Sequence, residues 1–390
     1  MSSRRIRYGM VGGGEGAFIG EIHRMAARLD DSFELVCGAF SSDKTRSLSS
    51  GKTLGLDEPR CYPEYATMIE TEQSLPVDER MQCVVIVTPN HSHFDIAAAA
   101  LSQGFHVLSD KPATATLDEC QNLSRFLEKS NLLYGLTHTY TGYPMIREAR
   151  DRVAAGQLGK VRKILVEYTQ GWLAGKEEEN NNPQAAWRLD PEKAGASCCM
   201  GDIGVHAFNL AEFVSGLAVT KLNAELNSIV EGRKLDDDGT VLLQFDNGAH
   251  GTLLASQVCV GDENNFRLRV YGEKASLDWQ QMEPNTLWMK YNDKAAEMIR
   301  TGTAVTGPGA ASHTRLPPGH PEGYIEAFAN LYSRFADEII AASEGKVIEK
   351  TVPGMEEALR GMAFIETTVA SSDEGNVWKE MPVFQEQGTG

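Results

Sequence analysis

The chain has 390 residues, a formal net charge of −17 and ordinary proportions of apolar and charged residues for a water-soluble protein. That length suggests two domains, each able to bury its own core. The negative charge argues against a nucleic-acid partner, because such binding depends on neutralising phosphates, and no apolar run is long enough to span a bilayer.

The cysteines and the first residues indicate the compartment. The seven cysteines are odd in number and form no C-x-x-C pair, which favours reduced thiols over a disulfide framework or a structural zinc site. Two arginines near the start are followed by an expected strand and not by an apolar signal segment. We therefore expect a cytoplasmic protein with no metal and no membrane partner.

The first third of the chain alternates short strands with helices. The run at 83–87 is continuously apolar, as expected for a central parallel strand that is buried on both faces. The expected strands are 7–11, 33–40, 83–87, 105–108 and 132–136, and the expected helices are 19–29, 93–103 and 117–129. This alternation predicts an α/β, Rossmann-type doubly wound parallel sheet over residues 1–139.

After residue 140 the pattern changes. The expected elements are helices at 144–155 and 202–215, a strand at 161–170, a loop at 180–183, and strands at 221–230, 238–246, 249–260, 266–272 and 274–279. Turns near Asn247 and Glu273 suggest hairpins. Residues 140–390 are therefore predicted to form an α+β domain with a large, mostly antiparallel open sheet, a surface loop at 301–321 and closing helices within 322–371.

A glycine-rich turn joins the first expected strand to the first helix. Gly12, Gly14 and Ala17 fit the pattern G-x-G-x-x-A, in which glycines let the backbone approach a pyrophosphate at a helix N-terminus. Gly16 and Gly20 permit other frames. The position of the turn predicts a dinucleotide site.

The residues after the second strand bear on the choice of cofactor. Ser41, Ser42 and Arg46 can receive the extra phosphate of NADP, whereas Asp43 can bind the ribose hydroxyls of NAD. All four can equally be solvated turn residues. The choice between NAD and NADP stays open.

The loop after the central strand is expected to line the cofactor crevice. Thr88, Asn90 and His93 are its candidate contacts, mainly through the backbone. Asn90 can instead cap the following helix, and His93 can be a structural residue.

Asp110 and Lys111 end another expected strand, on the cofactor side of the predicted sheet. Pro112 cannot donate a backbone hydrogen bond and biases Lys111 away from helix, so the strand ends abruptly. A lysine held there can work on a substrate hydroxyl.

A second chemical pattern lies in the later domain. Asp202 and His206 are four apart on an expected helix and share one face. Histidine can accept a proton near neutral pH, and an acid beside it can orient it or bind a hydroxyl. Alternatively, Asp202 is a helix cap and His206 a packed core residue.

Other side chains are candidates for contacts with a polyhydroxylated ligand. Trp187 and Arg188 can stack on such a ligand and hydrogen-bond to it, or they can anchor the fold. The remaining candidates for the pocket wall are His138, Tyr140, Tyr143, Gln170 and Trp172.

These motifs together resemble the Gfo/Idh/MocA oxidoreductases over about residues 6–378. The glycine turn, Thr88-Pro89-Asn90, Asp110-Lys111-Pro112, Trp187-Arg188 and Asp202-x-x-x-His206 stand in that family's order. The family's usual Glu-Lys-Pro is Asp-Lys-Pro here. Residues 15–19 lengthen the glycine turn, and residues 195–199 replace a more glycine-rich stretch.

The resemblance implies a nicotinamide domain followed by a substrate domain, whose open sheet often joins subunits into a homodimer or homotetramer. It implies an NAD- or NADP-dependent dehydrogenase for a secondary hydroxyl of a sugar, glycoside or cyclitol. His206 would remove the hydroxyl proton, Lys111 would hold the oxygen, and Asp202 would position the substrate or His206. Two alternatives use the same fold: redox-assisted glycoside cleavage, and nucleotide sensing without catalysis.

Overall fold

The computed structural model describes residues 5–128, 130–180, 182–347 and 349–384, which form two compact units. The first unit contains residues 1–142 and Tyr324–Ala358, and the second contains Tyr143–Gly323 and Leu359–Gly390. The expected division at 139/140 placed all of 322–371 in the later domain, whereas residues 324–358 make their contacts in the first unit. In the described part of the chain, no helix has the length and apolar character that crossing a membrane requires.

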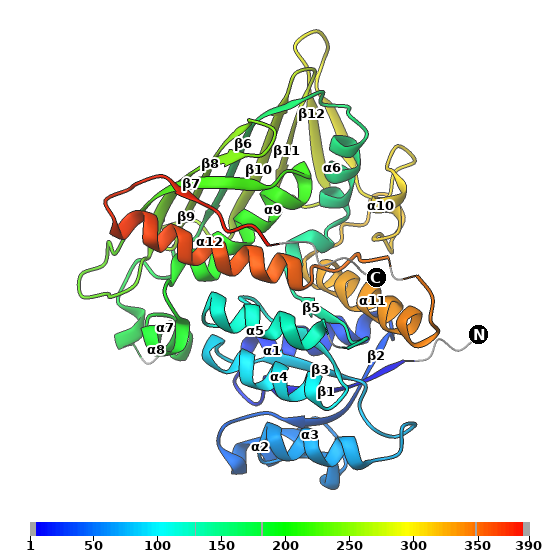
Figure 1. The fold of residues 1–390 in the computed structure, drawn as a ribbon. Coiled ribbons are helices and arrows are strands. Elements are labelled where there is room, and N and C mark those ends of the chain that lie inside the picture. Colours follow the sequence, from blue (N-terminus) through cyan, green and yellow to red (C-terminus); the bar gives the residue numbers. More distant parts are fainter. Residues whose placement is uncertain (1–4, 129, 181, 348, 385–390) are drawn as a thin grey trace. The chain divides into compact units, whose positions relative to one another are not determined.

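The first unit is built on a five-stranded parallel sheet (Figure 1). Its strands in spatial order are β2 (Phe33–Ala39), β1 (Ile6–Gly12), β3 (Cys83–Val87), β4 (His106–Ser109) and β5 (Tyr134–Leu136). Its helices are α1 (Phe18–Leu29), α2 (Lys44–Thr53), α3 (Tyr65–Ser74), α4 (His93–Ser102), α5 (Leu117–Leu127) and α11 (Tyr324–Ser343). Three 3₁₀ turns are η1 (Glu58–Arg60), η2 (Asn90–Ser92) and η3 (Thr139–Gly142). The predicted Rossmann-type sheet is confirmed.

Helix α11 returns from late in the sequence to complete the core of this unit. It packs on α1, and the buried rings of Phe33, Phe328 and Tyr332 meet the sheet and His23 there. These contacts explain why 324–343 belongs to the first unit, because the aromatic face of α11 buries its apolar area against α1 and β2.

The second unit contains a nine-stranded sheet that is antiparallel except for the central β6–β9 pair, which is parallel. Its strands in spatial order are β13 (Glu297–Arg300), β12 (Thr286–Lys290), β11 (Ser276–Gln280), β10 (Asn265–Gly272), β6 (Val161–Thr169), β9 (His250–Ser256), β8 (Asp238–Phe245), β7 (Val219–Asn227) and β14 (Lys379–Glu380). The large, mostly antiparallel sheet is confirmed.

Helices α6 (Pro144–Ala154) and α9 (Val205–Ser215) pack on this sheet and on each other (Figure 1). The other helical segments are η4 (Glu177–Glu179), α7 (Pro183–Arg188), α8 (Pro191–Ala194), the π-helical η5 (Met200–Gly204), α10 (Pro308–Ala311) and α12 (Met355–Asp373). Helix α12 begins in the first unit, and its residues from 359 onward belong to the second.

Several expected boundaries differ from the structure. Helices α2, α3, α7 and α8 and strands β12 and β13 were not predicted, and the expected loop 301–321 contains the short helix α10. The expected helix at 202–215 begins as a π-helical turn at 200. The expected end of the third helix at Lys129 and part of the loop at 180–183 lie outside the described residues.

Candidate active site

The glycine turn follows β1 directly, and there is no space for a side chain at Gly12 and Gly14 in the turn or at Gly20 in α1. A Cβ atom on Gly12, whose φ is +84°, would lie 2.8 Å from the Val87 carbonyl oxygen. A Cβ atom on Gly14 would lie 2.8 Å from the Phe40 carbonyl oxygen, and one on Gly20 would lie 2.3 Å from the Cα atom of Gly13. Glycine is required here because the turn passes against β2, β3 and α1.

The amino end of α1 suits a pyrophosphate. Its cap residue is Ala17, whose side chain cannot accept a hydrogen bond, so the first-turn N–H groups are left for other acceptors. The backbone therefore fits the dinucleotide predicted from Gly12, Gly14 and Ala17.

The β2–α2 turn is built by hydrogen bonds among the residues considered for cofactor selection. Asp43 caps α2 by accepting from the Arg46 backbone N–H at 2.8 Å, and Ser41 accepts from the Asp43 N–H at 3.1 Å. The Arg46 guanidinium donates to the Glu15 carbonyl at 3.1 Å, and Ser42 is exposed. Arg46 thus ties the glycine turn to α2.

The loop after β3 is held by His93. The histidine is buried, and its Nδ1 and Nε2 atoms each lie 2.8 Å from a backbone carbonyl oxygen, of Pro112 and Thr88 respectively. Burial lowers the pKa of His93. Asn90 is also buried, in the turn η2 that precedes α4. The described contacts of the His93 side chain are structural, and they join the two loops that carry Thr88 and Lys111.

Asp110 sets the geometry of the strand exit that carries Lys111. Its carboxylate accepts from the Lys111 backbone N–H at 2.9 Å and from the Thr137 hydroxyl at 2.8 Å. The peptide bond between Lys111 and Pro112 is cis. Burial, together with the charge of Lys111, lowers the pKa of His138 to about 3. Lys111 and His138 are therefore electrostatic neighbours.

The two tyrosines expected in the pocket wall are both buried, and each lies near another aromatic ring. Tyr140 is buried, with its ring centroid 6.3 Å from that of Tyr324. Tyr143 is buried in the second unit, with its ring centroid 5.5 Å from that of Trp279.

In the second unit, Asp202 lies in the π-helical turn η5, and His206 lies in the first turn of α9. A π-helical turn has about 4.4 residues and not 3.6, so residues four apart still lie close to one face. Asp202 therefore does not cap an ordinary helix, which was one of the two sequence interpretations. His206 is 9% exposed.

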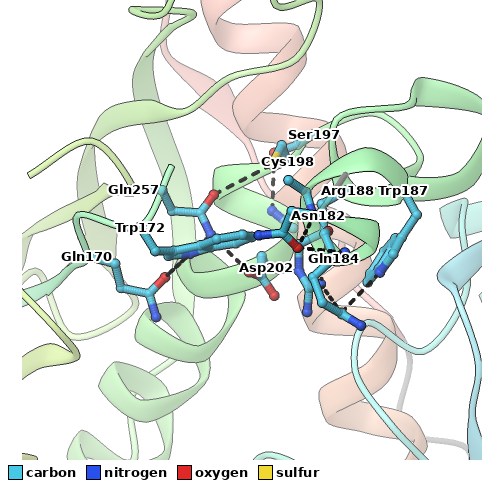
Figure 2. Close-up of polar contacts among 12 residues, drawn as sticks. Gln170, Trp172, Asn182, Gln184, Trp187, Arg188, Ser197, Cys198, Asp202 and Gln257 are labelled. Carbon is cyan, nitrogen blue, oxygen red and sulfur yellow. Dashed lines mark hydrogen bonds and ion pairs between the residues drawn. The ribbon is translucent and has the colours of Figure 1, made fainter. Parts of the chain in front are cut away.

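Asp202 belongs to a continuous group of polar side chains (Figure 2). Its Oδ2 atom accepts from Arg188 Nε at 3.2 Å and from Gln257 Nε2 at 2.9 Å. Gln257 Nε2 also lies 3.5 Å from Gln170 Oε1, which accepts from Trp172 Nε1 at 3.0 Å. The structure therefore joins Gln170, Trp172, Arg188 and Asp202, all of which were predicted from the sequence.

Two tryptophans flank Arg188. The centre of its guanidinium lies 4.3 Å from the Trp187 ring centroid and 5.9 Å from that of Trp172. The Gln184 side-chain carbonyl accepts from Arg188 at 2.7 Å and from the Trp187 indole at 3.3 Å. Arg188 is consequently fixed in position, between aromatic surfaces that could stack on a sugar ring.

Sequence reasoning missed Gln184 and Gln257. The expected strand at 249–260 ran through Gln257, but β9 ends at Ser256. A glutamine close to the apolar residues 253–255 and 258–260 was the available signal for a buried polar contact. No cluster of three or more metal-ligating side chains occurs among the residues that the structure describes.

Comparison with known proteins now identifies the family. Residues 6–138 match the model of an oxidoreductase family with an NAD-binding Rossmann fold, and residues 146–278 match the GFO/IDH/MocA C-terminal domain. The chain belongs to the Gfo/Idh/MocA family of oxidoreductases. It is an oxidoreductase with an NAD-binding Rossmann domain, as predicted.

Three relatives illustrate the likeness of this Gfo/Idh/MocA protein. An uncharacterised oxidoreductase of Bacillus subtilis is 33% identical over 97% of both chains. The inositol dehydrogenase homologue of Azotobacter vinelandii, solved with NAD⁺, is 36% identical with a TM-score of 0.93, over 97% of this chain and 98% of that one. The levoglucosan dehydrogenase of Pseudarthrobacter phenanthrenivorans is 23% identical over 97% of this chain and 99% of its own length.

Proposed function

We propose that this protein is an NAD-dependent dehydrogenase that oxidises a secondary hydroxyl of an uncharged sugar or cyclitol, or reduces the corresponding ketone. The observation that carries the proposal is the hydrogen-bonded group of Asp202, Arg188, Gln257 and Gln170 beside Trp172 and Trp187. Amides and a carboxylate bind hydroxyls, and indole rings cover the apolar face of a sugar ring.

The charges favour an uncharged substrate. The guanidinium of Arg188 is already paired with Asp202 at 3.2 Å and bonded to Gln184, so it offers little free charge to a phosphate or carboxylate. A related protein supports the substrate class: the Azotobacter vinelandii homologue was solved with NADH and myo-inositol, and is 35% identical over 97% of this chain.

The proposed reaction divides the work among three residues. Bound NAD⁺ supplies the hydride acceptor. His206 takes the proton of the substrate hydroxyl, and Lys111 stabilises the negative charge that develops on that oxygen. Asp202, held by Arg188 and Gln257, accepts a hydrogen bond from a substrate hydroxyl and so orients the ring.

We also propose NAD over NADP. Asp43 places a carboxylate at the β2–α2 turn, where it can bind ribose hydroxyls and would repel a 2′-phosphate. Arg46, the basic residue of this turn that was considered as a phosphate ligand, already donates to the Glu15 carbonyl.

The test begins with a panel of myo-inositol, D-glucose, levoglucosan and glucose 6-phosphate, followed by NADH absorbance. We expect turnover of an uncharged member. Lys111→Met and His206→Asn should each lower kcat by roughly 10²- to 10⁴-fold, the range expected for acid–base and electrostatic groups. Lys346→Met, at an exposed lysine of the first unit, is the matched control. Near-normal turnover in both site variants would contradict these roles, as would glycoside hydrolysis without net NADH formation.

A further inference from the structure

Gln257 follows the last residue of β9 and is completely buried. Its backbone N–H donates to the Asp237 carbonyl at 2.8 Å, and its backbone carbonyl accepts from the Leu173 N–H at 3.1 Å. The main chain of Gln257 therefore holds the segment that follows Trp172, independently of the hydrogen bonds of its side chain.

The side-chain amide has partners that match only one orientation. Its Nε2 atom lies 2.9 Å from Asp202 Oδ2 and 3.5 Å from Gln170 Oε1, which are both acceptors. Its Oε1 atom accepts from the Cys198 thiol at 3.5 Å. An inverted amide would place its oxygen against a carboxylate, which cannot donate.

Cys198 stays a donor in this arrangement. Burial raises the pKa of its thiol well above the ordinary value, and the nearby carboxylates Asp202 and Asp236 raise it further. Asp236 is buried and is itself occupied by the Ser197 hydroxyl and the N–H groups of Cys198 and Met200. The Gln257 side-chain oxygen therefore accepts from a neutral thiol, and the turn that carries this thiol is held by hydrogen bonds to Asp236.

Asp202 is held from two sides on one oxygen. Arg188 approaches Oδ2 from helix α7, and Gln257 approaches it from the end of β9. Two donors from separate elements fix the rotation of the carboxylate. Through Gln170, the same amide is linked to the Trp172 indole (Figure 2).

We propose that Gln257 is a positioning residue of the dehydrogenase, which fixes Asp202 and the Gln170–Trp172 pair in the arrangement that aligns a polyol ring. The assignment rests on the proposed function, because it supposes that Asp202 contacts the substrate. Gln257 itself need not touch the substrate.

The first test is Gln257→Met, which keeps the length of the side chain and removes its hydrogen bonds. With the panel member that the wild-type enzyme turns over best, kcat/KM should fall on the order of tenfold, as expected when a hydrogen bond to a charged group is lost. NADH affinity, measured by fluorescence titration, should stay within twofold of wild type. Gln281→Met is the matched control, because no partner of the buried Gln281 Oε1 atom is found among the described residues. A kcat/KM for Gln257→Met within twofold of both wild type and Gln281→Met would overturn the proposal.

The second test separates positioning from mere structural support. In Gln257→Glu, the new carboxyl would face Asp202 and share a proton with it as the pH falls, which restores a donor. The ratio of variant to wild-type kcat/KM should therefore rise several-fold from pH 8 to pH 6 for Gln257→Glu and stay flat for Gln257→Met. Flat ratios for both variants would show a structural role and overturn the assignment.

Asp202→Asn distinguishes the two proposals. If Asp202→Asn loses activity but Gln257→Met keeps it, the positioning role is wrong and the proposed function stands. If Asp202→Asn keeps full activity, the substrate role of Asp202 and this assignment fail together, while the dehydrogenase activity stands. If the wild-type enzyme turns over no member of the panel, the proposed function fails and this assignment fails with it.

Discussion

Asp43 caps α2, and it is also the residue that we propose as the ribose ligand at the cofactor turn. Its side chain accepts from the Arg46 N–H, a contact that serine can also make. We expect Asp43→Ser to keep stability and to lower the preference for NAD over NADP. Asp43→Ala should lower that preference equally and also cost about 1 kcal/mol of unfolding free energy. Urea unfolding and kcat/KM for both cofactors measure the two effects; an unchanged cofactor preference in both variants would refute the selective role.

Arg188 is where a conservative substitution should have the clearest effect. Its planar guanidinium bonds both Asp202 and Gln184 and stacks on Trp187, whereas a lysine ammonium cannot reproduce this geometry. We expect Arg188→Lys to raise KM for the polyol by about tenfold, with the affinity for NADH unchanged. Steady-state kinetics and NADH titration distinguish this result from a fall in kcat alone, which would contradict a role in binding.

The candidate site was predictable where residue identity and local spacing carry the signal. Lys111 before a proline, Asp202 four residues before His206, and Trp187 beside Arg188 are visible as short patterns. Gln257 is not, because its importance depends on β9 running parallel to β6, which places it beside Gln170, 87 positions earlier in the chain. Long-range pairing of this kind leaves no local pattern.

At the element scale, α2 was not predicted because it does not bury an apolar face. Helix α2 buries Ser47, Ser50 and Gly51, and the Ser47 hydroxyl donates to the Tyr62 carbonyl at 2.6 Å. Its sequence therefore lacks the apolar periodicity of an amphipathic helix. By contrast, β3 was evident because all five of its residues are buried and apolar.

The contact between α1 and the glycine turn gives a prediction at this scale. A Cβ atom on Gly20 would meet the Gly13 Cα atom at 2.3 Å, so the helix would have to move away from the turn. We expect Gly20→Ala to lower unfolding free energy by roughly 1–3 kcal/mol and to weaken NADH binding. The control is Gly175→Ala, whose nearest neighbour would lie 3.6 Å away. Equal stability of the two variants, measured by urea unfolding, would show that α1 does not need this close approach.

At the scale of a whole unit, we expect the buried His23 and His138 and the half-buried His106 to make the first unit sensitive to acid. Burial lowers the pKa of His23 and of His106 to about 4, and burial with the charge of Lys111 lowers that of His138 to about 3. The unfolded chain binds protons below about pH 6.5, while the folded chain does not until about pH 4. The free energy of unfolding should therefore keep its full value above pH 6.5 and fall as the pH drops toward 4. The fall should be up to about 1.4 kcal/mol per pH unit for each histidine.

His106 offers a direct test of this pH dependence. Its Nδ1 atom accepts from the Leu133 N–H at 3.0 Å, and an asparagine oxygen can replace that acceptor without titrating. We expect His106→Asn to reduce the slope of unfolding free energy between pH 4.5 and 6.5, measured with urea. His250→Asn, at an exposed histidine of the second unit, should leave the slope unchanged. Equal slopes for both variants would assign the acid sensitivity to other groups.

The outward face of the nine-stranded sheet carries exposed apolar side chains, which suggest how copies of the chain associate. One cross-strand row on this face consists of Asn223, Leu242, Thr252, Leu165, Arg269, Asp278, Trp288 and Met298. Leu242, Trp288 and Met298 are 43%, 38% and 55% exposed. The residues on either side of Leu242 and of Trp288 in their strands are buried in the core. Trp288 and Met298 pair on neighbouring strands and form an exposed apolar patch, of the kind that marks an interaction surface.

We propose that this face pairs with a second copy of the chain, since a self-complementary patch is the usual basis of a two-fold dimer. Replacing Leu242 and Trp288 together by glutamate would place like charges opposite one another across such an interface. Their repulsion would weaken the association free energy by several kcal/mol. We expect the wild-type protein to sediment as a dimer or tetramer, and the double variant to sediment as a monomer with an unchanged circular dichroism spectrum. A matched variant, Leu48→Glu with Val77→Glu, changes exposed apolar residues of the first unit and should leave the sedimentation unchanged. A wild-type monomer, or an oligomer that survives the double substitution, would show that this sheet face is not the site of self-association.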